Sequence, residues 1–107
     1  MDKRVKKPVL PDVAAMRREK FYADIAAGIL TISQAALAMR KISRLTQAEF
    51  AKHRGISVQS LKQIEAGTAN PTVDTLEKIS AIFGLKIGFV ADLKANQAGD
   101  SQVTIPP

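Results

Sequence analysis

Apolar residues recur at intervals of three and four positions along most of residues 12–84. This spacing places them on one face of an α-helix. Glycine, proline and small polar residues interrupt the pattern and divide it into five segments. The pattern therefore predicts five helices, over about residues 12–28, 31–44, 46–55, 57–67 and 72–84.

The expected helix ends are marked by residues that satisfy free backbone groups. Thr31 with Gln34, and Thr46 with Glu49, have the spacing of a capping box, in which each side chain binds the backbone N–H of the other residue. Ser57 is a further expected N-cap. The remaining boundaries are Asp12 as the first N-cap, Thr72 or Asp74 as the last one, and Gly28, Gly55, Gly67 and Gly84 as terminators.

The pattern changes after Gly84. Apolar residues alternate with other residues over Leu85–Val90, which predicts a short β-strand. A lone strand leaves backbone donors and acceptors unpaired, and the simplest partner is the same strand of a second copy, related by a two-fold axis. The residues expected to form this dimer contact are Leu85, Ile87, Gly88 and Phe89.

The chain is expected to consist of one structured domain and two ends. Residues 1–11 are basic, contain two prolines, and are expected to form a flexible arm. Residues 95–107 are mostly polar and are expected to be a disordered tail. The fold class that follows for residues 12–94 is all-α: a compact bundle of about five helices, with one short C-terminal strand paired in a dimer.

Composition narrows the class of protein. With 107 residues, 46% of them apolar, the chain can bury one core, and because only 5% are aromatic, aliphatic side chains must fill it. The chain has no cysteine, so disulfides and thiolate metal sites are excluded. No apolar run approaches the roughly 18 residues of a membrane span, so we expect a cytoplasmic protein without a membrane partner.

The charge balance is basic, with 16 lysine and arginine residues against 10 aspartate and glutamate residues. This favours a polyanionic partner, either nucleic acid or an anionic membrane surface, although a surplus of solvated lysines gives the same balance. An enzyme is disfavoured, because the only histidine is His53 and no glycine-rich phosphate loop or carboxylate cluster is present. No cofactor is expected.

The segment Thr46–Gly67 has the organisation of a helix-turn-helix. Two short helices are joined by a tight turn at Arg54–Ile56, where Gly55 permits a positive φ. Ala51 is small enough to let the helices cross closely. The residues expected to point inward and fix the crossing are Ile56, Leu61 and Ile64.

Together with the residues that follow it, this segment resembles the XRE, or Cro/repressor, type of helix-turn-helix domain. The resemblance covers about residues 33–85. It implies that the partner is double-stranded DNA and that the second helix of the motif lies in the major groove. The matching residues are Gln47, Ala51, Gly55, Ser57, Leu61, Ile64–Gly67, Asn70–Thr72, Leu76, Ile79 and Gly84–Leu85.

The resemblance also implies roles by position. Gln47 would donate to a phosphate or brace the second helix, while Val58, Gln59, Lys62 and Gln63 would face the groove. Glutamine can bind adenine in a bidentate way, lysine suits guanine, and valine can contact a thymine methyl group. A solvated helix surface would show the same residue types. Further phosphate contacts are expected from Ser57, Ser60, Arg44 and Arg54, with Arg40 and Lys52 as additional cations.

The residues Phe83–Lys94 resemble the end of HipB-type antitoxins, in which a strand after the last helix forms an intermolecular sheet. This resemblance implies a homodimer, which would read a palindromic operator, and a kinase toxin as a protein partner. Two functions therefore stay open: a DNA-binding repressor, or an adaptor that keeps the fold and binds protein through its N-terminal helix or tail. The basic charge and the polar side chains Gln59, Lys62 and Gln63 favour the repressor.

Overall fold

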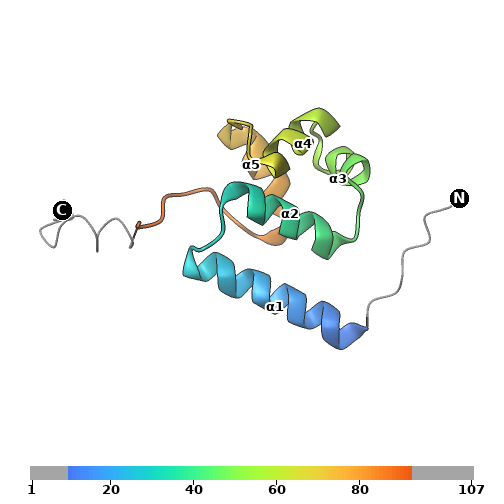
Figure 1. The fold of residues 1–107 in the computed structure, drawn as a ribbon, viewed down its shortest axis with the longest axis vertical. Coiled ribbons are helices and arrows are strands. Elements are labelled where there is room, and N and C mark those ends of the chain that lie inside the picture. The colour runs from blue at the N-terminus through green and yellow to red at the C-terminus, as the bar shows by residue number, and fades with distance from the viewer. Residues whose placement is uncertain (1–9, 93–107) are drawn as a thin grey trace, which may run out of the picture.

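The computed structural model describes residues 10–92, so the expected arm and tail lie almost wholly outside the described residues. Five α-helices are present in this range, as the sequence predicted (Figure 1). None of them is long and apolar enough to cross a bilayer. The helices are α1 (Pro11–Ala27), α2 (Ile32–Ser43), α3 (Gln47–Arg54), α4 (Val58–Ala66) and α5 (Val73–Ser80), followed by the 3₁₀ turn η1 (Ala81–Phe83).

Both predicted capping boxes are confirmed. At the start of α2, the Gln34 N–H donates to Thr31 Oγ1 at 3.1 Å, and the Thr31 N–H donates to Gln34 Oε1 at 2.9 Å. At the start of α3, the Glu49 N–H donates to Thr46 Oγ1 at 3.1 Å, and the Thr46 N–H donates to Glu49 Oε1 at 2.8 Å. Each box satisfies two backbone donors that a helix leaves free, and so fixes where the helix begins.

The first helix begins two residues earlier than predicted. Leu10 occupies the N-cap position without a side-chain hydrogen bond, Pro11 is the first helical residue, and Asp12 lies in the first turn. Proline is suited to this position because its φ is already helical and its missing N–H would have no partner there. Asp12 therefore complements the helix dipole and is not the cap. At α5, Thr72 is the cap, with its Oγ1 accepting from the Thr75 N–H at 3.1 Å.

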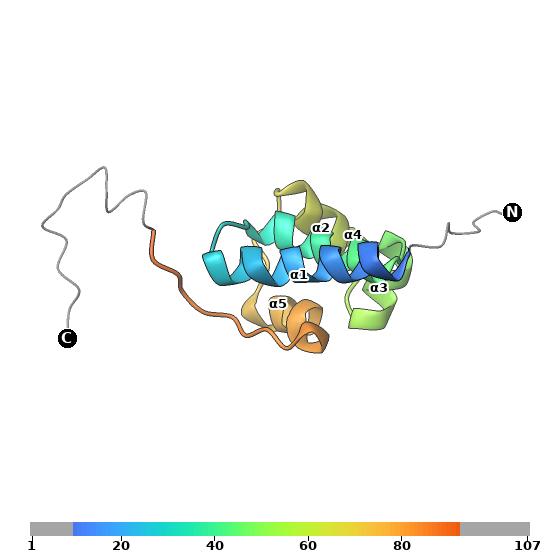
Figure 2. The ribbon, with the colours of Figure 1, turned by 90° about the horizontal axis from the view of Figure 1, so that it is seen from below.

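Helix α2 lies at the centre of the fold. It contacts α1 on one side and α3, α4 and α5 on the other (Figure 1). Seen from the side of α1, that helix runs lengthwise across the helices behind it (Figure 2). The buried core contains Phe21, Ala36, Met39, Phe50, Ala51, Leu61, Ile64 and Ile79.

Aromatic residues connect α1 to η1, near the C-terminal end of the described residues. The ring of Phe21 packs edge-to-face on Tyr22 at 5.3 Å and on Phe83 at 5.8 Å between centroids. The Tyr22 hydroxyl also donates to the backbone oxygen of Phe83 at 2.9 Å. The N-terminal helix is therefore held to η1 by packing and by a hydrogen bond.

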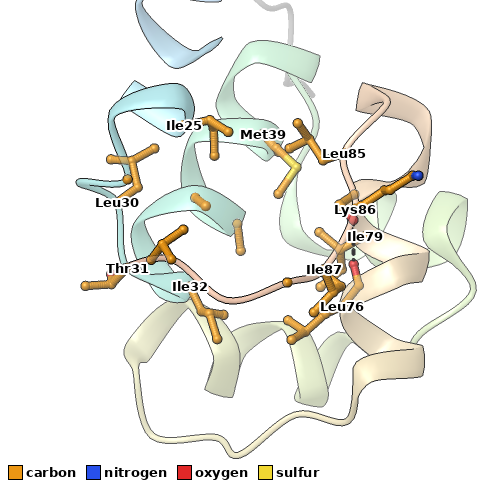
Figure 3. Close-up of a pocket in the computed structure, with 16 residues that line it drawn as sticks. Ile25, Leu30, Thr31, Ile32, Met39, Leu76, Ile79, Leu85, Lys86 and Ile87 are labelled. Atoms are coloured by element: carbon orange, nitrogen blue, oxygen red, sulfur yellow. Dashed lines mark hydrogen bonds between the residues drawn. The ribbon is translucent and has the colours of Figure 1, made fainter. Parts of the chain in front are cut away.

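The prediction of a β-strand over Leu85–Val90 is wrong for the single chain, because residues 10–92 contain no strand. The segment is extended but lies on its own helices. Leu85 and Ile87 line a cavity of about 300 Å³ together with Ile25, Met39 and Leu76 (Figure 3). The alternating pattern therefore belongs to an unpaired segment that contacts its own helices through Leu85 and Ile87 and leaves Phe89 fully exposed.

Candidate nucleic-acid interface

Helices α3 and α4 are joined by the tight turn expected of a helix-turn-helix. Gly55 ends α3 with φ +73°, and the Ile56 N–H donates back to the Ala51 oxygen at 3.0 Å. A Cβ atom on Gly55 would meet nothing within 4 Å. Glycine is therefore favoured here by the left-handed backbone and not by lack of space. Ser57 then caps α4, its Oγ accepting from the Ser60 N–H at 3.0 Å.

The crossing of the two helices is built as the sequence predicted. Ala51 is 2% exposed, and Leu61 and Ile64 are 0% and 3% exposed. Ile56 is partly buried and packs on the same core. These contacts fix which side of α4 faces the protein, and therefore which side faces outward.

The outward side of α4 presents the residues that the sequence assigned to base contacts. Val58 is 39% exposed, and Gln59, Lys62 and Gln63 are also exposed. At positions i, i+1, i+4 and i+5 they share one side of a helix, opposite Leu61. The structure thus gathers one apolar, one cationic and two amide side chains on an open helix surface.

A network of charged and polar groups fixes α4 against its neighbours. The carboxylate of Glu65, whose side chain is 7% exposed, receives Arg40 Nε at 2.7 Å on Oε2 and Arg40 Nη2 at 3.0 Å on Oε1. Gln47 Nε2 also donates to Oε1 at 3.0 Å, and Arg40 Nη1 donates to the Leu45 oxygen at 3.1 Å. One carboxylate therefore connects α2, α3 and α4 at a single point.

This network also determines the protonation of Glu65. Burial acts to raise its pKa, but the hydrogen bonds from Arg40 and Gln47 and the positive charges of Arg40 and Lys41 together outweigh burial. The pKa of Glu65 is consequently lowered from the ordinary value of 4.5. The group is a carboxylate at neutral pH, which the bidentate contact with Arg40 requires.

A comparison with protein families adds one decisive observation. A family model described as helix-turn-helix matches residues 37–90, which is half of the chain. The chain belongs to the helix-turn-helix family. Its immunity-repressor relative from Bacillus phage phi105 is 31% identical over 61 residues, covering 57% of this chain and 42% of the relative. The match thus spans less than half of the relative's length, and no solved structure matches significantly.

Within this helix-turn-helix domain, Gln47 has one of its two expected roles. Its amide donates to Glu65 and so braces α4, while contact with a phosphate stays a prediction. Glu65 has a structural role, with Arg40 as its charged partner. The spacing did not identify Arg40, because the two residues are 25 positions apart.

The other expected phosphate contacts are placed around the same helices. Arg44 is the C-cap of α2 and has φ +59°. The guanidinium of Arg54 lies 4.8 Å from the centroid of the Phe50 ring, and Arg54 Nε is buried without a hydrogen-bond partner among the described residues. Ser57 and Ser60 are hydrogen-bonded to each other at 2.9 Å between hydroxyls, at the N-terminus of α4. Ser57 and Ser60 thus lie at the start of α4, and Arg44 and Arg54 lie at the ends of α2 and α3. Their contact with DNA stays a prediction.

The residues expected to form the dimer contact separate into two groups. Leu85 and Ile87 face the cavity of their own domain, together with Gly88. Phe89 is fully exposed, at 107% of its reference area. Of the predicted contact residues, Phe89 therefore offers the largest apolar surface to a second copy.

Proposed function

We propose that this helix-turn-helix protein is a sequence-specific DNA-binding regulator that acts as a transcriptional repressor. The observation that supports it best is the exposed side of α4, with Val58, Gln59, Lys62 and Gln63 held outward by buried Leu61 and Ile64. The name of the phage relative, an immunity repressor, supports the same function.

The mechanism follows from the chemistry of these side chains. With α4 in the major groove, Gln59 and Gln63 would bind adenine edges, Lys62 would bind guanine, and Val58 would contact a thymine methyl group. The cap of α4 would point its free N–H groups, with Ser57 and Ser60, toward a phosphate. Further contacts to the phosphate backbone of DNA would come from Arg44, Arg54 and Gln47. These contacts would fix the position of α4 on the duplex without reading the base sequence.

DNA binding should weaken steeply with salt. Titrating the full chain into labelled DNA from upstream of its own gene should give a logarithmic slope of about −0.9 for each phosphate neutralised. Arg44→Ala should make that slope shallower and weaken all sequences alike. Arg18→Ala, on α1 and away from α4, is the matched control and should leave the slope unchanged. An affinity independent of salt would contradict the repressor and favour the protein-binding adaptor.

We further propose that the regulator is a homodimer that reads a palindromic operator. The two α4 helices would then be separated by about one turn of DNA, roughly 34–36 Å. The exposed ring of Phe89 supports a contact between copies near residues 85–90. An antitoxin role, implied by the resemblance to HipB-type proteins, additionally requires a toxin that binds this chain. A kinase-like gene next to its own would support that role.

Removing the exposed ring should dissociate the dimer. Phe89→Ser should weaken dimerisation by at least about 3 kcal/mol, because burying one such ring contributes about 1.5–3 kcal/mol and a two-fold axis buries two. Light scattering measures the mass, and operator titration measures the linked loss of affinity. Met16→Ser removes a side chain that is 65% exposed on α1 and serves as the control. A Phe89→Ser protein that stays dimeric would place the interface elsewhere.

A further inference from the structure

A groove of about 420 Å³ lies between α1 and α2 and combines two kinds of surface. Its floor is apolar and buried or half-buried, whereas its rim is mostly cationic and exposed. The floor consists of Phe21, Leu30, Ala38 and Ile42, and the rim of Arg17, Lys20, Asp24 and Lys41.

The rim has an excess of positive charge. Lys20 binds Asp24 with 3.0 Å between Nζ and Oδ2, so these two charges offset each other. Arg17 and Lys41 make no ion pair with any residue of the described range 10–92. One unpaired cation from each helix therefore flanks the apolar floor.

The groove is separate from the proposed DNA-reading surface. Helix α1 lies on the opposite side of α2 from α4 (Figure 1). The residues of α1 also precede Leu37, where the match to the helix-turn-helix family begins. DNA on α4 would thus leave the groove open.

We propose that this groove docks an acidic amphipathic segment of a partner protein. Its apolar side chains would cover the floor, and its carboxylates would meet Arg17 and Lys41. Residues 3–7 and 93–107 of this chain do not supply such a segment. Residues 3–7 contain four cations and no acid, and residues 93–107 contain one lysine and one aspartate, with no net side-chain charge. Nucleic acid offers the negative charge but little apolar surface for the floor.

Fluorescence anisotropy with the full chain tests the proposal. The probe is a labelled, helix-forming synthetic peptide of leucine and glutamate, and the comparison peptide has lysine in place of glutamate. We expect the acidic peptide to bind, with or without saturating DNA, and the basic peptide not to bind. Arg17→Glu with Lys41→Glu should weaken binding of the acidic peptide at least about tenfold, because like charges then face each other.

A matched double variant separates the groove from overall charge. Arg18→Glu with Lys86→Glu changes the net charge equally outside the groove, at two exposed positions, and should alter binding of the acidic peptide less than about twofold. The charge of Lys41 acts on Glu65, so Lys41→Glu also disturbs the network around that carboxylate. Arg17→Glu alone leaves the network intact, and it must weaken binding of the acidic peptide in the same direction as the double variant.

Three results would overturn the proposal. The first is an equal loss of acidic-peptide binding in the two double variants. The second is equal binding of the acidic and basic peptides to the wild-type protein. The third is binding of phosphatidylglycerol vesicles through Arg17 and Lys41 while the acidic peptide fails to bind, which would identify a membrane surface instead. Loss of DNA binding alone would affect only the proposed repressor function.

Discussion

Replacing Arg40 by methionine is expected to lower the free energy of unfolding by about 3–5 kcal/mol, because the variant leaves the charge of Glu65 buried without its bidentate partner. With Arg40 in place, only 7% of the Glu65 side chain is exposed, so water compensates poorly for the lost donors. Urea denaturation at neutral pH measures the effect. The double variant Arg40→Met with Glu65→Met removes both charges, and should be less destabilised than Arg40→Met alone.

The same network predicts how stability changes with pH. Because the pKa of Glu65 is lowered in the folded state, its contribution to stability is fully present above the ordinary value of 4.5 and is lost as the pH falls through the folded value. In the Arg40→Met variant, protonation of Glu65 removes the charge that has lost its partner. The difference in stability between wild type and Arg40→Met should therefore shrink toward acid. A difference that stays constant from neutral to acid pH would show that Arg40 stabilises by packing and not by charge.

Replacing both Gln59 and Gln63 by alanine is expected to cost about 2–6 kcal/mol of specific DNA binding, since each bidentate base contact is worth about 1–3 kcal/mol. Both residues are exposed, so the folded state should keep its stability. Affinity for random DNA should change little, because phosphate contacts supply it.

Two comparisons make that experiment decisive. Glu77→Ala, at an exposed position on α5, should leave operator and random DNA binding as in wild type. Gln47→Ala removes a donor to Glu65 and should lower stability, unlike the change at Gln59 and Gln63. Wild-type discrimination between operator and random DNA in the Gln59→Ala, Gln63→Ala protein would exclude α4 as the reading helix.

Local chemistry explains which parts of this fold the sequence predicted. The capping boxes at Thr31 and Thr46 depend on residues three positions apart, so their spacing alone located the starts of α2 and α3. At the start of α1 and at residues 85–90 the local signal had two readings. Asp12 suits a cap or a first turn, and an alternating pattern fits an extended chain on its own core as well as a paired strand.

The site divides in the same way. The side of α4 that faces outward follows from the helical period, which places Leu61 and Ile64 opposite Gln59 and Gln63. The contact of Glu65 with Arg40 joins α4 to α2, and no spacing rule connects residues on different helices. The groove between α1 and α2 likewise depends on how those helices pack, so it became visible only in three dimensions.

Tyr22, which is hydrogen-bonded to the Phe83 oxygen, gives α1 its own fluorescence signal. The chain has one tyrosine and no tryptophan, so its fluorescence in the tyrosine band comes from this ring alone. Circular dichroism, in contrast, reports all the helices. Coincident melting curves from the two signals would assign α1 to the same cooperative unit as the rest of the domain, whereas an earlier fluorescence change would show that it separates first. The intrinsic fluorophore thus lies on a helix outside the region that matches the family.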